Sequence, residues 1–396
     1  MELFVHQYDT GCAAGAVCAV LEDSIMRKGS PVAAGSRMLE GFISPIDATV
    51  VSRLESVGIS ILGKTRMDEF GAAGLFAALP NPHDPQAGLS EPTQILGSQL
   101  EKRSGAVAAV ADGIADFALC NDYTGSVGVE AAARGLYYLH PTYGSVSRYG
   151  LIPLTPSMDQ IGVVCKTPED GLRFLATIAG FDEKDGAMRP AQGVERGTRS
   201  AECETWGVGA GDDAALTVGL PSNALGCFPG SADFNKFIGK FNTIEFELKH
   251  FDVYAQVMQI LCCAELSNCI SRYDGVKFGH RASGYNGLRE LYTRSRTEAF
   301  GADAKLSALT GAMVLSQEYY SKYYDKAMRI RRLIKESLDF DKYDVIAMPS
   351  GAALALQALP RLCGLPALTI PAHGGGITLI ADANREAFLF RIASGL

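Results

Sequence analysis

Short apolar runs recur along the chain and are separated by more polar segments. A run of about four to eight apolar residues predicts a buried strand, because both faces of such a strand are covered. We expect strands of this kind at 17–21, 59–62, 216–220, 345–348 and 367–370. These runs lie near both ends of the chain and in its middle, so the predicted sheet draws on distant parts of the sequence.

Helices are predicted between these runs, some of them from their end signals. Thr167 is expected to cap a helix that has Pro168 at its first position and runs to about Ala179. Asp47 is expected to cap a second helix, which continues to Leu54. Runs of small residues predict tightly packed helices at 104–113 and 130–135. Helical spacing predicts two more, at 255–270 and 316–340.

The alternation of short strands and helices predicts one α/β domain over 1–396, built around a mixed sheet. Residues 182–212 are polar and glycine-rich, so we expect a surface excursion there. Apolar residues make up 47% of the chain and charged residues 20%, which is typical of a globular protein. The formal net charge of −8 and the lack of a basic tail argue against strong direct binding of nucleic acid through its phosphates.

We expect neither a targeting segment nor a membrane anchor. Residues 1–8 lack the basic start and apolar core of a signal peptide, and no apolar run approaches the roughly 20 residues that cross a membrane. None of the 10 cysteines form a Cys-x-x-Cys pair, so we expect reduced thiols and no structural zinc site. These features predict a cytoplasmic protein without membrane contact.

The segment 122–126, Asp-Tyr-Thr-Gly-Ser, is the first candidate for chemistry. It follows the apolar run 114–119, and its small residues predict a tight turn that ends at Ser126. A serine in such a turn can act as a nucleophile, with backbone N–H groups ready to bind an oxyanion. The alternative is an ordinary glycine turn with a solvated hydroxyl.

A second candidate is the segment 58–65, which fits the phosphate-loop pattern G-x-x-x-x-G-K-[ST]. Its intervening residues are largely β-branched and apolar, which favours a strand over a flexible loop around a nucleotide. We interpret the segment as a strand that delivers Lys64 to an interior site. A desolvated lysine loses its proton more easily and can serve as a base; the alternative is an exposed lysine at a strand end.

Several separated segments then match a known pattern in order: 46–51, 63–70, 141–150 and 158–162. They resemble the amidase signature family, over the chain from about residue 15 to the end. Three later segments resemble in particular the A subunits of tRNA-dependent amidotransferases, namely 271–279, 323–327 and 364–367. The resemblance implies a mixed central sheet covered by helices on both faces. The N-terminal helices usual in the family have no counterpart in this sequence.

The resemblance also implies a Ser–Ser–Lys triad. Ser126 matches the family's nucleophile and Lys64 its base, while backbone N–H groups of Tyr123, Thr124, Gly125 and Ser126 itself would hold the oxyanion. The implied reaction is hydrolysis of a small carboxamide such as glutamine, with release of ammonia. Amidotransferase partner subunits are implied as well, and no metal or organic cofactor.

The sequence departs from the family at the triad itself. The bridging serine of the triad falls on Lys102, and Ser98 and Ser104 are the stand-ins nearby. The family's Asp-Thr-Gly-Gly-Ser turn has become Asp-Tyr-Thr-Gly-Ser, which puts the bulk of Tyr123 into the oxyanion loop. An arginine of the family is replaced by Gly128.

The positions that bind the charged end of glutamine in these A subunits are also changed. Register places Leu306 or Ser307 at the family's arginine and about Leu354 at its aspartate. Unpaired substrate charges would cost several kcal/mol in a pocket of this kind. The alternative to an active amidohydrolase is therefore a catalytically impaired member that has a binding or regulatory role beside other subunits.

Overall fold

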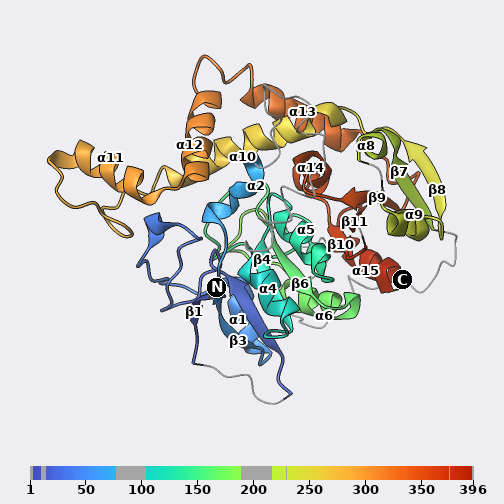
Figure 1. Ribbon diagram of the computed structural model, residues 1–396, viewed down its shortest axis with the longest axis horizontal. Helices are drawn as coiled ribbons and strands as arrows, with labels where there is room; N and C mark the ends of the chain where they lie inside the picture. Colours follow the sequence, from blue (N-terminus) through green and yellow to red (C-terminus); the bar gives the residue numbers. More distant parts are fainter. Residues whose placement is uncertain are drawn as a thin grey trace.

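The computed structural model describes residues 3–9, 15–76, 104–188, 216–228, 230–373 and 375–394 (Figure 1). An 11-stranded sheet runs through this part of the chain in the order β1-β3-β2-β4-β6-β5-β10-β11-β9-β7-β8. Its strands are β1 Phe4–Gln7, β2 Cys18–Glu22, β3 Ser60–Thr65, β4 Phe117–Asn121, β5 Tyr137–His140, β6 Ile161–Cys165, β7 Thr217–Pro221, β8 Asn242–Phe246, β9 Val345–Ser350, β10 Ala367–Ile370 and β11 Gly376–Ala381.

The sheet is mixed, as the sequence predicts. Strand β2 is parallel to both of its neighbours, β3 and β4, and β7 is parallel to β8 and β9. The strands between these two groups pair antiparallel. The carboxyl ends of β3, β2 and β4 consequently meet at one edge, which is where α/β proteins place their ligands.

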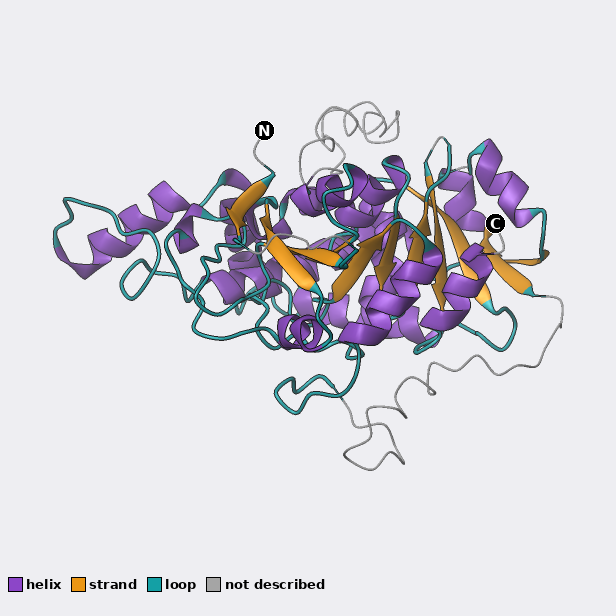
Figure 2. Ribbon diagram, turned by 90° about the horizontal axis from the view of Figure 1, so that it is seen from below, coloured by secondary structure: helices purple, strands orange, loops and turns teal. Residues whose placement is uncertain are grey.

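Helices cover both faces of the sheet (Figure 2). Apolar side chains of α1, α6, α9 and α15 pack on one face, and those of α4, α5 and α14 pack on the other, where α10, α12 and α13 add an outer layer. Helix α11 extends away from one end of the molecule (Figure 1). The helices are α1 Thr49–Ser56, α2 Ala73–Phe76, α4 Gly105–Ala111, α5 Ser126–Ala133, α6 Pro168–Ile178, α8 Ser222–Cys227, α9 Ala232–Ile238, α10 Tyr254–Ile270, α11 Gly287–Ala299, α12 Ala302–Val314, α13 Tyr324–Glu336, α14 Leu354–Cys363 and α15 Glu386–Ser394.

Most elements with strong local signals lie where the sequence predicts them. The Thr167 side chain accepts a hydrogen bond from the Asp170 N–H and so caps α6, which has Pro168 in its first turn. The strand predicted at 59–62 is β3 and extends to Thr65, paired on both sides, so the phosphate-loop alternative is wrong. The predicted excursion at 182–212 lies mostly outside the described residues.

Three predicted helices differ from the observed ones. The helix expected at 130–135 is α5, which begins at Ser126, directly after the turn. The cap of α1 is Ala48, because the Asp47 carboxylate accepts a hydrogen bond from the Lys28 N–H instead. The long helix expected over 316–340 is only α13, which begins at Tyr324. Turns precede it, where several tyrosines lie close together, and aromatic side chains lose rotamer freedom in a helix.

Helix α10 is the interior helix of the outer layer. With the turn before it, Phe251–Ile270 is long and apolar enough to cross a membrane by length and composition alone, and 56% of an apolar 18-residue stretch within it is buried inside the protein. It packs against α12, α13 and α14, which is the environment of a core helix. The expectation of reduced thiols is wrong at Cys18, which is disulfide-bonded.

Candidate active site

Three parallel strands bring the predicted base and nucleophile to one edge of the sheet. Lys64 lies at the end of β3, and Ser126 follows the turn after β4. Strand β2 lies between these two strands and is parallel to both. Adjacent strands are about 4.8 Å apart, so β3 and β4 run roughly 10 Å from one another.

The turn before Ser126 is organised by the Asp122 carboxylate. One of its oxygens accepts the Gly125 N–H at 2.7 Å and the other accepts the Gly128 N–H at 3.1 Å. Gly125 has a φ of 90°, in the left-handed region that favours glycine, and Ser126 is the first residue of α5. The conformation that presents Ser126 therefore depends on Asp122 and Gly125 together.

Helix α14 holds this turn from the other half of the chain. The Arg361 guanidinium donates to the Asp122 backbone oxygen at 2.9 Å and lies 3.1 Å from the Asp122 carboxylate, with both side chains buried. One helical turn earlier, Gln357 packs so closely that a Cβ on Gly125 would lie 2.5 Å from its Oε1. Neither residue was predicted as part of the site from the sequence. The sequence pattern that could have indicated them is a pair of polar residues, four positions apart, within an otherwise apolar helix.

Ser126 is half-buried and forms a hydrogen bond with its near neighbour Thr124. Their hydroxyl oxygens lie 3.1 Å apart, and either group can be the donor. The N–H of Gly125, one of the predicted oxyanion donors, is engaged by Asp122. The N–H groups of Tyr123 and Thr124 donate to no other residue in the described part of the chain.

The bulk of Tyr123 does not occupy the oxyanion loop, contrary to expectation. Its ring is buried in the hydrophobic core, and its hydroxyl donates to the Phe70 backbone oxygen at 2.8 Å. A Cβ on Gly71 would approach the ring to 3.0 Å, so glycine makes room for the tyrosine at that position. The tyrosine therefore points into the protein and anchors the turn.

Lys64 has the environment of a desolvated base. Its side chain is fully buried, and its amine has no hydrogen-bond partner among the residues that the structure describes. Burial, helped by the charge of Arg27 and opposed by that of Asp23, lowers the pKa of Lys64 to about 8. A substantial fraction of the amine is therefore neutral at mildly alkaline pH.

The central strand contributes a carboxyl group that was not predicted from the sequence. Glu22, the last residue of β2, accepts hydrogen bonds from the Ser24 hydroxyl at 2.5 Å and from the Asn121 N–H at 3.3 Å. Burial, helped by the nearby charges of Asp68 and Asp122, raises the pKa of Glu22 to about 8. Glu22 is consequently protonated at neutral pH.

The bridging position of the triad is described only in part. Lys102 and Ser98 lie outside the described residues. Ser104 caps α4 by accepting the Val107 N–H at 3.3 Å. A Cβ on Gly105 would lie 2.8 Å from the Arg66 nitrogen, so α4 begins beside the end of β3.

The other altered positions differ from one another in burial and surroundings. Leu306 is exposed on α12, whereas Ser307 and Leu354 are buried. Gly128 faces β10, where a Cβ would lie 3.1 Å from the Thr369 hydroxyl oxygen. Leu354 starts α14, the helix whose Gln357 and Arg361 contact the turn.

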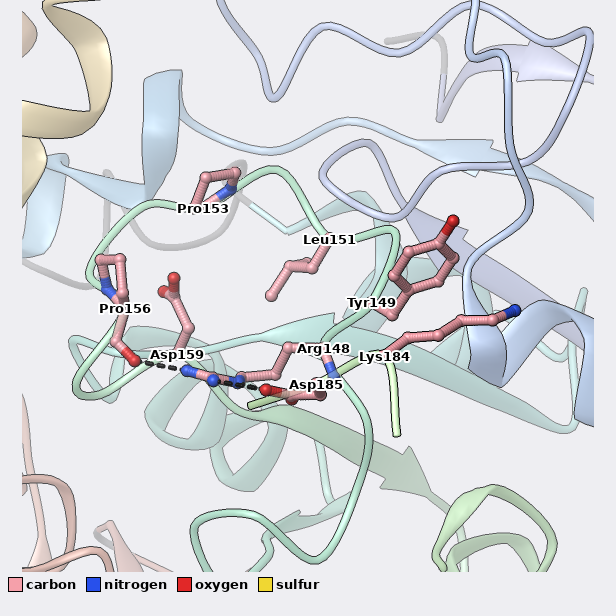
Figure 3. Close-up of a pocket in the computed structure, with 8 residues that line it drawn as sticks. All are labelled: Arg148, Tyr149, Leu151, Pro153, Pro156, Asp159, Lys184 and Asp185. Atoms are coloured by element: carbon pink, nitrogen blue, oxygen red, sulfur yellow. Dashed lines mark hydrogen bonds and ion pairs between the residues drawn. The ribbon is translucent and has the colours of Figure 1, made fainter. Parts of the chain in front are cut away.

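A cavity of about 180 Å³ opens beside the site (Figure 3). It is lined by Arg148, Tyr149, Leu151, Pro153, Pro156, Asp159, Lys184 and Asp185. The Arg148 side chain is held between Asp185 and the Pro156 backbone oxygen. The cavity wall reaches the site through Asp159, whose carboxylate accepts the Asn121 side-chain amide at 2.9 Å at the end of β4.

These features agree with a comparison of the chain with known protein families. The sequence model of the family described as Amidase matches residues 6–361. The chain belongs to the amidase family. The match includes β3 with Lys64, the turn with Ser126, and α14 as far as Arg361, so the amidase pattern spans the whole candidate site.

Named relatives of this chain come from several bacteria. It is 34% identical over 377 residues to the A subunit of the glutamyl-tRNA(Gln) amidotransferase from Lachnoclostridium phytofermentans, covering 89% of this chain and 74% of that protein. It is 35% identical over 384 residues to the protein of the same name from Akkermansia muciniphila, covering 89% of this chain and 78% of that protein. Both relatives therefore carry the same name and have a similar level of identity to this chain.

Solved structures share the fold of this chain. The A subunit of the glutamyl-tRNA(Gln) amidotransferase from Thermotoga maritima superposes with a TM-score of 0.68 at 24% identity, covering 99% of this chain and 86% of that chain. The native peptide amidase of Stenotrophomonas maltophilia gives a TM-score of 0.67 at 22% identity, covering 95% of this chain and 81% of that chain. The fold is thus the amidase signature fold that the sequence predicts.

Proposed function

We propose that this amidase hydrolyses a carboxamide through the Ser126 hydroxyl, with Lys64 as the base, and releases ammonia. One observation carries the proposal. A half-buried serine begins α5 after a left-handed glycine, at the same sheet edge as a buried lysine whose pKa is lowered to about 8. Acyl transfer requires a nucleophile and, at the same site, a base that is unprotonated and can accept the proton of the nucleophile.

The proposed reaction begins with attack of the Ser126 oxygen on the carbonyl carbon of the amide. The Ser126 proton ends on the neutral Lys64 amine, and negative charge develops on the former carbonyl oxygen. The N–H groups of Tyr123 and Thr124 have no competing acceptor among the described residues and are the donors for this charge. The Gly125 N–H is not included, since Asp122 engages it.

Breakdown of this intermediate completes the cycle. The carbon–nitrogen bond breaks, Lys64 returns a proton to the leaving nitrogen, and ammonia departs. The remaining ester between Ser126 and the acyl group is hydrolysed by water, which restores the serine hydroxyl and releases a carboxylic acid. Glutamine is the first substrate to test, because the similar proteins are named as parts of glutamyl-tRNA(Gln) amidotransferases. The same names support the proposal that partner subunits work with this chain.

Ammonia release from glutamine and from simple carboxamides tests the proposal. Wild-type protein should release ammonia, and Ser126→Ala should abolish this release. Ser222→Ala is the matched control, since Ser222 also begins a helix directly after a strand, β7. Equal ammonia release by wild type and Ser126→Ala contradicts the proposed function. So does a wild-type protein that releases ammonia from none of the amides and forms no acyl adduct on Ser126.

A further inference from the structure

We propose that the Thr124 hydroxyl is a positioning group for the nucleophile, which it holds through a direct hydrogen bond to the Ser126 oxygen. This inference rests on the proposed function and deepens it. The two hydroxyl oxygens lie 3.1 Å apart, within normal hydrogen-bond range. The sequence alone suggested only a backbone N–H as the contribution of Thr124, so the side chain adds a second role.

The Thr124 side chain is fixed by its surroundings. It is buried, and it packs against α2, where a Cβ on Gly74 would lie 2.9 Å from the Thr124 hydroxyl oxygen and 3.0 Å from its Cβ. Threonine is β-branched and has few rotamers, so this contact determines where its hydroxyl points. The hydroxyl is therefore a rigid partner for a neighbouring group.

Ser126 lacks such constraints of its own. It is half-buried at the first position of α5, and an unbranched serine side chain there can adopt several rotamers. A hydrogen bond from the rigid Thr124 hydroxyl selects one of them. With Thr124 as the donor, the Ser126 proton stays available for the base, and charge developing on the Ser126 oxygen is stabilised. Thr124 keeps its own proton throughout.

The segment that supports Thr124 also supports the residue before it. The Tyr123 hydroxyl donates to the Phe70 backbone oxygen, and the ring lies against Gly71. The side chains of Tyr123 and Thr124 thus both pack against the short stretch 70–74, where Gly71 and Gly74 leave room for them. That stretch fixes the turn from one side, as α14 does from the other.

The test is the rate at which a fluorophosphonate acylates Ser126, measured by intact mass at several probe concentrations. Thr124→Val keeps the shape and removes the hydroxyl, and it should lower the maximal acylation rate at least tenfold with little change in apparent probe affinity. Thr124→Ser restores a hydroxyl and should recover the rate to within about threefold. A packing role would give the opposite order, because valine fills the site as threonine does.

A second pair of variants keeps the test decisive if Thr124→Val does not fold. Gly74→Ala pushes a Cβ against the Thr124 hydroxyl and should slow acylation at least threefold, although every hydroxyl is present. Gly226→Ala is its control, since that helical glycine has nothing within 4 Å of the added Cβ. A wild-type rate in Thr124→Val, or in Gly74→Ala if Thr124→Val does not fold, overturns the role of Thr124 and leaves the proposed function standing. A wild-type chain that forms no adduct on Ser126 overturns both.

Discussion

The Arg361 guanidinium lies 3.1 Å from the Asp122 carboxylate, and both side chains are buried. The two residues are 239 positions apart in the sequence. Asp122 in turn accepts the N–H groups of Gly125 and Gly128 on either side of Ser126. The conformation of the turn before Ser126 is therefore set by a helix from a distant part of the chain.

Removal of this cation should destabilise the whole protein. Arg361→Met leaves the Asp122 charge buried without its partner, which typically costs about 3–5 kcal/mol in the free energy of unfolding. Urea unfolding measures the change. The exposed pair of Arg332 with Glu336 supplies the control, and Arg332→Ala should leave the unfolding midpoint unchanged. Equal midpoints for the two variants would show that the buried pair does not support the fold.

Gly125→Ala should disturb the turn in two ways. The residue has a φ of 90°, and an added Cβ would lie 2.5 Å from the Gln357 side chain, so strain and crowding together should cost about 2–5 kcal/mol. Gly113→Ala separates the two effects, since Gly113 has a φ of 73° but open space around its Cβ. Unfolding measurements on both variants should show a clearly larger loss for Gly125→Ala. A similar loss at both sites would mean that the contact with Gln357 is unimportant.

Acylation of Ser126 should depend on pH through Lys64. Only the neutral amine accepts a proton, and the pKa of Lys64 is lowered to about 8 by burial, so the rate should rise with pH and reach half of its maximum near pH 8. Lys64→Met should abolish both the rate and its pH dependence, whereas Lys342→Met, at an exposed lysine, should change neither. A wild-type profile that stays flat between pH 6 and about 10 would contradict the role of Lys64.

Glu22 should make the folded state less stable as the pH rises. Burial raises its pKa from the usual 4.5 to about 8, so between these values the folded protein holds a proton that the unfolded chain has lost. The free energy of unfolding should therefore fall across this window, by about 1.4 kcal/mol for each pH unit. Glu22→Gln removes the titrating group and should flatten the fall between pH 5 and 8. Urea unfolding at pH 5 and pH 8 measures this for wild type, Glu22→Gln and the exposed control Glu336→Gln. The same fall in the free energy of unfolding for all three proteins would refute the role of Glu22.

Local signals predicted the elements that position the site. The apolar run before Lys64 indicated β3, and the glycine and serine of the 122–126 segment indicated the turn that begins α5. Such features depend on residues close together in the sequence, whose propensities act in the same way in any fold. The buried position of Lys64 followed from the same strand.

The contacts that shape the site were not predictable in this way. Arg361 and Gln357 reach the turn from α14, and Glu22 lies at the end of the strand between β3 and β4. Which strands become neighbours depends on the packing of the whole sheet, and no local pattern records it. The position of the Tyr123 side chain was predicted wrongly for the same reason, because the ring fills space beside Gly71, which is distant in the sequence.

The central claim is that Ser126 is an activated nucleophile, and the mass of the intact protein after exposure to a fluorophosphonate tests it most directly. Wild-type protein should gain a single adduct, Ser126→Ala should gain none, and Ser222→Ala should behave as wild type. Wild-type protein that gains no adduct at any pH up to about 10, where a lysine of ordinary pKa begins to lose its proton, would contradict the claim.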